Sequence, residues 1–285
     1  MNRDQLVQEI YQKRSYLCVG LDTDLDKIPV HLHDHPNAVF EFNKQVIEAT
    51  KDYCVSYKIN TAFYEAMGIK GWEALQQTVE YIPASHFTIA DAKRGDIGNT
   101  SAQYAKTFFK IYGFDAVTVA PYMGEDSIRP FLDYADKVTI VLGLTSNKGS
   151  EDFEQLSVYK KLDPPFNKGL LIQDPSHEFL YERVLKQVAT WGNINNLMFV
   201  IGATKTEQLA HIRKLLPEHF FLVPGVGAQG GNLEAVSKAG LNKNAGLLVN
   251  ASRAIIYAST GEDYAEAAGR VAKVYADEMK ELLAE

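Results

Sequence analysis

Two aspartates and a lysine lie close together in the stretch 91–96, which reads Asp-Ala-Lys-Arg-Gly-Asp. The run 87–90 before it reads Phe-Thr-Ile-Ala and is typical of a buried strand. Because side chains alternate along a strand, Asp91 and Lys93 should share one face while Ala92 points away. We therefore expect an acidic and a basic side chain next to each other where this strand ends.

A turn and a capped helix are expected to follow. Gly95 and Gly98 break the strand. Either Asp96 or Asn99 can then cap a helix that begins near Thr100. Exposed ion pairs contribute little stability, whereas α/β folds place their sites at the carboxyl ends of strands. The position of these charges therefore favours a functional site over an exposed ion-pair loop.

The alternation of lysines and aspartates indicates the kind of chemistry. Ser146 has no obvious histidine partner, so a nucleophile arrangement is not indicated. Lys58 lies near the end of another apolar run and joins the set Asp91, Lys93 and Asp96. Carboxylates close to a lysine hold it in the charged form. A fixed ammonium group suits a reaction whose transition state carries negative charge on carbon, which it stabilises and then protonates.

Length and composition frame the protein that must position these residues. The chain has 285 residues, is 46% hydrophobic and 23% charged, and so fits a globular protein with a sizeable core. A net charge of -7 without a basic block argues against a nucleic-acid partner. Only Cys18 and Cys54 are present, both in apolar runs, which fits a reducing compartment. With no signal-peptide pattern or membrane-length apolar run, we expect a cytoplasmic protein with no membrane partner.

Strand and helix patterns alternate along the whole chain. After a covering helix at 2–13, eight strands are predicted at 16–21, 54–59, 87–90, 115–120, 138–144, 197–201, 220–223 and 245–250. The helical patterns between them cover 38–52, 68–81, 100–112, 127–134, 178–190, 206–216 and 233–239, and helices close the chain. Such alternation predicts an α/β fold, a (β/α)8 TIM barrel. We expect one domain over 1–285, with a long polar insert at about 148–176 after the fifth strand.

In such a barrel, the carboxyl ends of all eight strands meet at one mouth. The residues predicted there are Asp22, Lys58, Asp91 with Lys93, Tyr122, Ser146, Gly202, the turn 224–229, and Ser252 with Arg253. The turn begins at Pro224 and is rich in glycine, so its backbone N–H groups can face an anion. Arg253 adds a charged fork for phosphate oxygens. One glycine-rich turn could simply need glycine for its backbone angles, but two on adjacent strands favour phosphate.

A histidine cluster offers a competing metal site. His31, His33 and His35 would share one face if the segment were a strand. Pro29 and Pro36 make it a loop instead, and real metal sites need specific ligand geometry. We therefore predict no metal there.

Taken together, these residues resemble the orotidine 5'-phosphate decarboxylase family, in its longer bacterial form (type 2). The stretch 91–98 is similar to the family signature, and the remaining matches, in the family's order around the barrel, are Gly20-Leu21-Asp22, Lys58, Ser146-Asn147, 224–229 and Ser252-Arg253. The signature alone is shared with relatives, whereas the whole set is specific. The resemblance extends from about Tyr16 to the last helix.

The resemblance implies loss of CO2 from orotidine 5'-phosphate to give UMP, the last step of de novo UMP biosynthesis. It implies no metal and no organic cofactor. Lys93 would protonate C6 of the pyrimidine, and Asp91 would lie beside the departing carboxylate. It also implies a homodimer with shared active sites, in which the residues that reach into the neighbour's site are Asp96, Ile97 and Thr100.

The same resemblance implies the substrate contacts. Lys58 would link Asp91 to the ribose, and Asp22 would bind a ribose hydroxyl. Ser146 would recognise the pyrimidine ring. The phosphate would be held by Gln229, in the turn that starts at Pro224, together with Ser252 and Arg253.

Two departures and two alternatives accompany this interpretation. Ser252 stands where the family often has glycine, although the backbone N–H remains. The turn after Gln229 is short and the insert 148–176 is long, which leads to the hypothesis that the insert covers the site.

One alternative is a related sugar-phosphate enzyme, such as a hexulose-phosphate synthase or keto-gulonate-phosphate decarboxylase, that uses Mg²⁺ to stabilise an enediolate. Here Lys58 and Lys93 would supply the positive charge that Mg²⁺ supplies in those enzymes. The other alternative is a phosphate-binding barrel without activity, against which the intact charged set argues.

Overall fold

Eight parallel strands close into a barrel in this computed structural model, which describes residues 1–159, 177–227 and 230–284. Going around the barrel, the strand order is β1-β10-β9-β8-β5-β4-β3-β2. These strands are β1 (Leu17–Gly20), β2 (Ser56–Asn60), β3 (Phe87–Arg94), β4 (Ala116–Val119), β5 (Val138–Leu144), β8 (Leu197–Ile201), β9 (Phe220–Pro224) and β10 (Leu247–Ala251). The predicted (β/α)8 barrel is confirmed.

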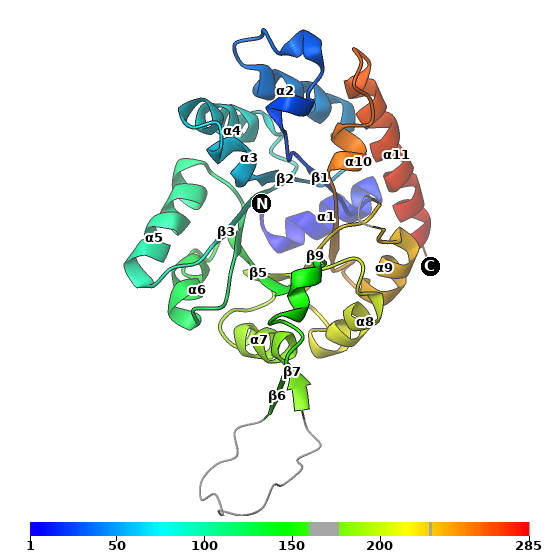
Figure 1. Cartoon of the computed structure of the whole chain (residues 1–285). Coiled ribbons are helices and arrows are strands. Elements are labelled where there is room, and N and C mark those ends of the chain that lie inside the picture. Colours follow the sequence, from blue (N-terminus) through cyan, green and yellow to red (C-terminus); the bar gives the residue numbers. More distant parts are fainter. Residues whose placement is uncertain (160–176, 228–229, 285) are drawn as a thin grey trace, which may run out of the picture.

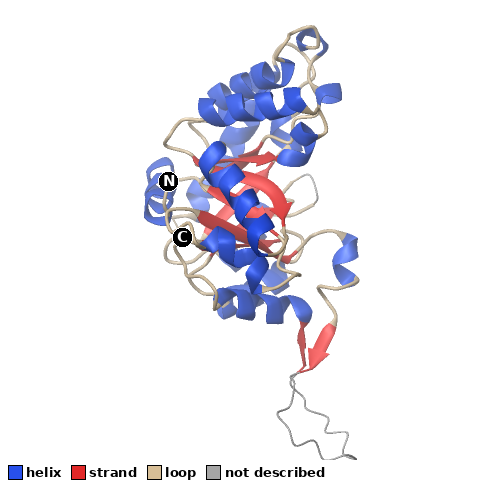
Figure 2. Ribbon diagram, turned by 90° about the vertical axis from the view of Figure 1, so that its left-hand side faces the viewer, coloured by secondary structure: helices blue, strands red, loops and turns tan. Residues whose placement is uncertain are grey.

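Helices surround the strands on the outside, as Figures 1 and 2 show. They are α1 (Arg3–Lys13), α2 (Ala38–Thr50), α3 (Thr61–Glu65), α4 (Ile69–Tyr81), α5 (Gly98–Lys106), α6 (Glu125–Leu132), α7 (Leu180–Ala189), α8 (Thr206–Leu215), α9 (Leu233–Gly240), α10 (Arg253–Ile256) and α11 (Tyr264–Leu282). Short 3-10 helices span Leu25–Lys27, Val30–Leu32 and Lys148–Glu151. The sequence did not predict α3, and the expected helix 100–112 is divided into α5 and a π-helix, Thr107–Ile111.

The strands are apolar because both of their faces are covered. Every residue of β1, β4, β8 and β10 is buried, as expected for a parallel sheet enclosed by helices. Cys18 and Cys54 are free and buried, as predicted.

Helix α1 closes the amino end of the barrel. Its side chains Arg3 and Leu6 line a small cavity with the first residues of three strands, Phe87, Val138 and Phe220. The Arg3 guanidinium lies over the Phe220 ring, 5.6 Å from its centroid. The predicted covering helix is therefore confirmed, and the opposite end of the barrel is the one left open for chemistry.

Strand β3 runs further than its apolar residues alone indicate. The predicted run ended at Ala90, but the strand continues to Arg94 with a register shift against β4. The expected cap of the next helix is wrong, because α5 begins at Gly98 and its N-cap, Ile97, supplies no side-chain hydrogen bond. The Asp96 carboxylate precedes the cap and accepts instead from the Ile97 N–H, at 2.7 Å.

The insert after β5 contains short secondary structure of its own. Strands β6 (Ser157–Tyr159) and β7 (His177–Phe179) pair antiparallel and stand out from the barrel beside α7. Because β7 takes up 177–179, helix α7 starts two residues later than the predicted 178. The hypothesis that the insert covers the site depends in part on 160–176, which lie outside the described residues.

Candidate active site

A cleft at the carboxyl ends of the strands brings both predicted groups of residues together. Its lining residues are Asp22, Lys58, Asn60, Asp91, Pro224, Gly225, Val226, Asn250, Ser252 and Arg253. They come from the ends of β1, β2, β3, β9 and β10 or from the residues that follow them. The barrel therefore places the charged group and the proposed phosphate group at one site.

Asp91 is the centre of an ion-pair network in this cleft. Its Oδ2 lies 2.7 Å from the Lys58 Nζ, and its Oδ1 lies 2.6 Å from the Lys93 Nζ. The Lys58 Nζ also lies 3.4 Å from the Asp22 Oδ1. Lys58 is only 3% exposed, whereas 49% of the Lys93 side chain is exposed. One ammonium group is thus enclosed by acids, and the other is accessible to a ligand.

In this network, neighbouring charges outweigh the effect of burial on the pKa of Lys58 and of Asp91. Burial works against the ammonium of Lys58, but the charges of Asp91 and Asp22 outweigh burial and raise its pKa above the ordinary value. Burial also works against the Asp91 carboxylate, but Lys58 and Lys93 outweigh it and lower the pKa of that carboxyl group. A fixed carboxylate between two cations is therefore present at neutral pH.

The part of the cleft expected to bind phosphate contains Pro224, Ser252 and Arg253, and its backbone is tight. Gly225 and Gly227 have φ values of 99° and 75°, so this turn needs glycine for its conformation as well. At Gly20, an added Cβ would lie 1.8 Å from the Ser252 Oγ. Gly20 therefore allows β1 to approach Ser252, and Arg253 follows at the start of α10. Gln229 lies outside the described residues.

Ser146 lies beside the cleft, not in its lining. Its hydroxyl is buried, and among the residues that the structure describes it has no hydrogen-bond partner. A Cβ at Gly202 would lie 2.4 Å from the Ser146 Oγ, so glycine there makes room for the serine. Tyr122, which was expected at the mouth, does not line the cleft and is 89% exposed.

The second half of the signature does not line the cleft. Asp96 has no ion pair with Lys93 in the described part of the chain, so only Asp91 pairs with that ammonium group. Ile97 is 56% exposed, and Thr100 is exposed as well. The structure therefore brings together three of the four alternating charges, and Asp96, Ile97 and Thr100 remain at the surface.

Two cleft residues were missed at the sequence level. Asn60 lies two residues after Lys58, where the alternation of a strand could have revealed it. Its Oδ1 accepts a hydrogen bond from the Ala62 N–H at 3.3 Å. Asn250 ends the apolar part of β10, and its Nδ2 donates to the Cys18 carbonyl at 3.1 Å. An amide after an apolar run gave no distinct signal.

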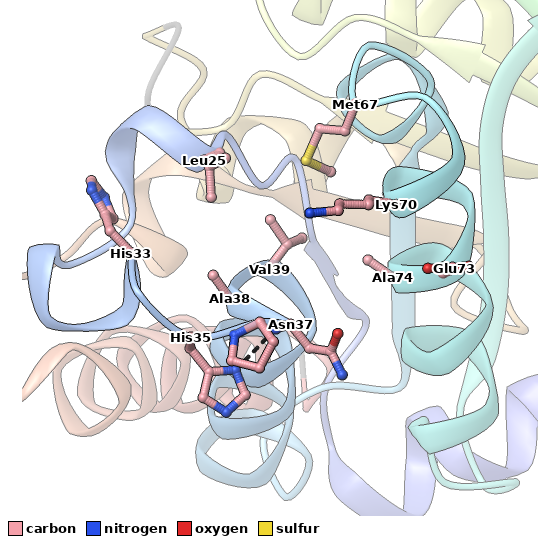
Figure 3. Close-up of a pocket in the computed structure, with 11 residues that line it drawn as sticks. Leu25, His33, His35, Asn37, Ala38, Val39, Met67, Lys70, Glu73 and Ala74 are labelled. Atoms are coloured by element: carbon pink, nitrogen blue, oxygen red, sulfur yellow. Dashed lines mark hydrogen bonds between the residues drawn. The ribbon is translucent and has the colours of Figure 1, made fainter.

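Two residues of the histidine cluster, His33 and His35, line a second hollow, between the segment before α2 and helix α4 (Figure 3). The His33 Nε2 lies 3.1 Å from the Ile28 carbonyl, and the His35 Nδ1 accepts from the Asn37 N–H at 3.1 Å. The two rings lie at different edges of the hollow. In the described ranges, no three His, Cys, Asp or Glu residues are grouped so that they could hold a metal ion. Nor is any described helix both long and apolar enough to span a membrane.

Comparison with known proteins decides the family. A model of the family described as "Orotidine 5'-phosphate decarboxylase / HUMPS family" matches residues 15–268. The chain belongs to this family. It is 53% identical to the orotidine 5'-phosphate decarboxylase of Christiangramia forsetii, over 98% of this chain and 97% of that protein. It is 52% identical to the enzyme of the same name from Bacteroides fragilis, over 99% and 98% of the two chains.

Solved structures agree with this assignment. The structure of Leishmania donovani OMP decarboxylase is similar to the present one, with a TM-score of 0.78 and 36% sequence identity. The similarity covers 98% of this chain and 99% of that one. The decarboxylase fold therefore accounts for nearly the whole chain.

Proposed function

We propose that this orotidine 5'-phosphate decarboxylase family member converts orotidine 5'-phosphate to UMP and CO2, the last step of de novo UMP biosynthesis. The family match and the relatives of about the same length support this activity. The observation that carries the mechanism is the Lys58–Asp91–Lys93 network at the mouth of the barrel.

The reaction breaks the bond between C6 of the pyrimidine and its carboxylate carbon. CO2 leaves, and the electron pair stays on C6. Without an electron sink, that charge must be stabilised by groups already in place. Lys93 supplies the positive charge, transfers a proton to C6, and regains a proton from solvent. Its contact with Asp91 and its exposed side chain support this role.

The rest of the cleft positions the substrate. Lys58 links Asp91 to the ribose, Asp22 binds a ribose hydroxyl, and Ser146 recognises the pyrimidine. The phosphate is bound at the other end of the cleft by Gln229, Ser252 and Arg253, in and beside the turn that begins at Pro224. Binding the phosphate far from the reacting carbon contributes energy for placing the ring against Lys93.

The proposal requires no metal and no organic cofactor, because two lysines provide the positive charge. Mixing the protein with orotidine 5'-phosphate in EDTA should therefore give the ultraviolet change of conversion to UMP. Lys93→Met should slow this change by about 10⁴-fold or more, since it removes both the charge and the proton donor. Activity that is lost in EDTA and restored by Mg²⁺ would favour the sugar-phosphate alternative. A wild-type chain that leaves the substrate unchanged would contradict the proposal.

The proposed active unit is a homodimer with shared sites. Asp96, Ile97 and Thr100 of each chain reach into the neighbour's cleft, which agrees with the exposure of Ile97 and Thr100 and with the absence of all three from the lining of their own cleft. Large apolar side chains are also exposed at Tyr122 and Met123, which follow the neighbouring strand β4, and such exposure is typical of an interface.

Hybrid dimers test this arrangement. Asp96→Ala and Lys93→Ala proteins should each be nearly inactive. An equal mixture should regain about one quarter of wild-type activity, because half of randomly exchanged dimers are hybrids and each hybrid has one intact site. No recovery, despite subunit exchange demonstrated with labelled chains, would contradict the shared site.

We further propose that residues 1–285 form one barrel domain with its insert at about 148–176, and that the protein acts in the cytoplasm. The closed barrel supports the first proposal, and membership of a biosynthetic enzyme family supports the second. Limited proteolysis tests the first, because one domain should lose only its insert before the barrel unfolds.

A further inference from the structure

Lys93 has an unusual backbone conformation. Its φ is 47°, in the left-handed region that residues other than glycine seldom adopt. It lies where the register between β3 and β4 shifts, between Ala90 and Arg94. Strain of this kind persists only where surrounding contacts maintain it. The contacts that fix the Lys93 backbone therefore also help to set the position of its ammonium group.

One side chain of β4 makes those contacts. The Thr118 Oγ1 accepts a hydrogen bond from the backbone N–H of Lys93 at 2.9 Å. The same hydroxyl donates to the Asp91 Oδ1 at 3.0 Å. That carboxylate oxygen is also the one that the Lys93 Nζ contacts, at 2.6 Å. A single hydroxyl thus joins the backbone of the lysine to the acid that pairs with its side chain.

Thr118 is well suited to hold this geometry. It is fully buried, so water does not compete for its hydroxyl. A β-branched side chain on a strand has few rotamers available, and the neighbouring residues Val117 and Val119 are buried as well. Thr118 has no exposed surface, whereas 49% of the Lys93 side chain is exposed, so Thr118 is not a group that contacts a ligand.

We propose that Thr118 is a positioning residue for the decarboxylation. It holds Lys93 in its left-handed conformation and orients the Asp91 carboxylate, so that the ammonium group faces the reacting carbon without movement during the reaction. This inference rests on the proposed function, and it adds a residue of the fourth strand that binds no substrate.

The test separates the hydroxyl from the shape of the side chain. Thr118→Val keeps the shape but removes both hydrogen bonds, so Lys93 can leave its strained conformation. A misplacement of about 1 Å can cost about 100-fold in rate, so we expect kcat to fall about 10- to 100-fold. KM and the affinity for UMP should change by less than about 3-fold, because the phosphate and ribose contacts remain. Thr118→Ser keeps the hydroxyl and should restore kcat to within about 3-fold of wild type.

Thr139 provides a matched control. It lies on the adjacent strand β5 and is 1% exposed. In the described part of the chain its Oγ1 has no hydrogen-bond partner. Thr139→Val makes the same chemical change without removing a hydrogen bond, so kcat should stay as in wild type. If Thr118→Val does not fold, Thr118→Ala removes the same hydroxyl and should show the same loss of kcat.

The outcomes distinguish this inference from the proposed function. A wild-type protein inactive on orotidine 5'-phosphate contradicts the function itself. An active wild type with normal kcat in Thr118→Val or Thr118→Ala contradicts the role of Thr118. A loss of kcat that serine does not restore, or that is matched by an equal loss of UMP binding, also contradicts it, because a general packing defect would then explain the result.

Discussion

Each end of the barrel holds a lysine, buried for Lys58 and half-buried for Lys13, but the partners of the two lysines differ. At the carboxyl end, the Lys58 Nζ contacts carboxylates. At the amino end, the Lys13 Nζ lies 2.9 Å from the Lys51 carbonyl, 3.0 Å from the Cys54 carbonyl and 2.9 Å from the His86 Nε2. The first lysine has charged partners, and the second has neutral ones.

The difference between charged and neutral partners sets the direction in which the pKa of each lysine shifts. Burial lowers the pKa of Lys13, and more distant charges do not restore it. Burial acts on Lys58 as well, yet the adjacent carboxylates raise its pKa. The comparison shows that the partners, and not burial itself, decide whether the pKa of a lysine rises or falls. The carboxyl end is arranged for chemistry, and the amino end holds chain segments together through hydrogen bonds.

The largest contrast is expected from removing each lysine. Lys58→Met leaves the Asp91 carboxylate with one cation fewer, so kcat/KM should fall by about 10²- to 10³-fold, as for other preorganised charges. Lys13→Met should leave kcat/KM within about 2-fold, while losing about 1–3 kcal/mol of unfolding free energy through unpaired carbonyls. Steady-state kinetics and urea unfolding of both variants measure the two effects. Equal losses of kcat/KM in the two variants would contradict the proposed difference between the two lysines.

Acid should lower the unfolding free energy, and the amino end of the barrel should respond first. Burial and the neighbouring Lys13 lower the pKa of His86 from 6.5 to about 4. Burial and the neighbouring Arg213 and Arg3 lower the pKa of His219 likewise to about 4. Below pH 6.5 the unfolded chain takes up protons that the folded chain does not, so the unfolding free energy should fall between these values. Each histidine contributes up to about 3 kcal/mol to this fall.

Urea unfolding at a series of pH values checks this prediction. His86→Gln should flatten the pH dependence, while His31→Gln, at an exposed position, should leave it unchanged. The lowered pKa of Asp91 acts in a different window, since its contribution is lost only as the pH falls below the ordinary aspartate range. A loss of stability that begins only there would mean that the carboxyl end responds to acid first.

The strongest apolar patterns predicted the fold closely. The bounds of β5 and β8 are those expected from the sequence, because both faces of these strands are buried and their runs are continuous. β3 was predicted too short. Its last residues include the charged Asp91, Lys93 and Arg94, which are unusual in a buried strand, and its register against β4 shifts between Ala90 and Arg94. The short helix α3 had too few residues to show a helical period.

The site residues were predictable where a charged side chain stands at the end of an apolar strand, which is an unusual place for it. Charged residues at strand ends revealed Asp22, Lys58 and Asp91, and the barrel then brought them together. Thr118 gave no such signal, because threonine is common in strands for reasons of shape alone. Its role depends on a register shift in the neighbouring strand, which no local pattern encodes.

The seam of the barrel lies between its first and last strands, where Leu17 pairs with Val249 and Val19 with Ala251. Residues on the two sides of this seam, Asp22 and Arg253, share the cleft. A chain still emerging from the ribosome therefore cannot assemble the cleft until its final strand has been made. Closing contacts between such distant segments is slow, so activity should appear after synthesis only once the barrel has closed.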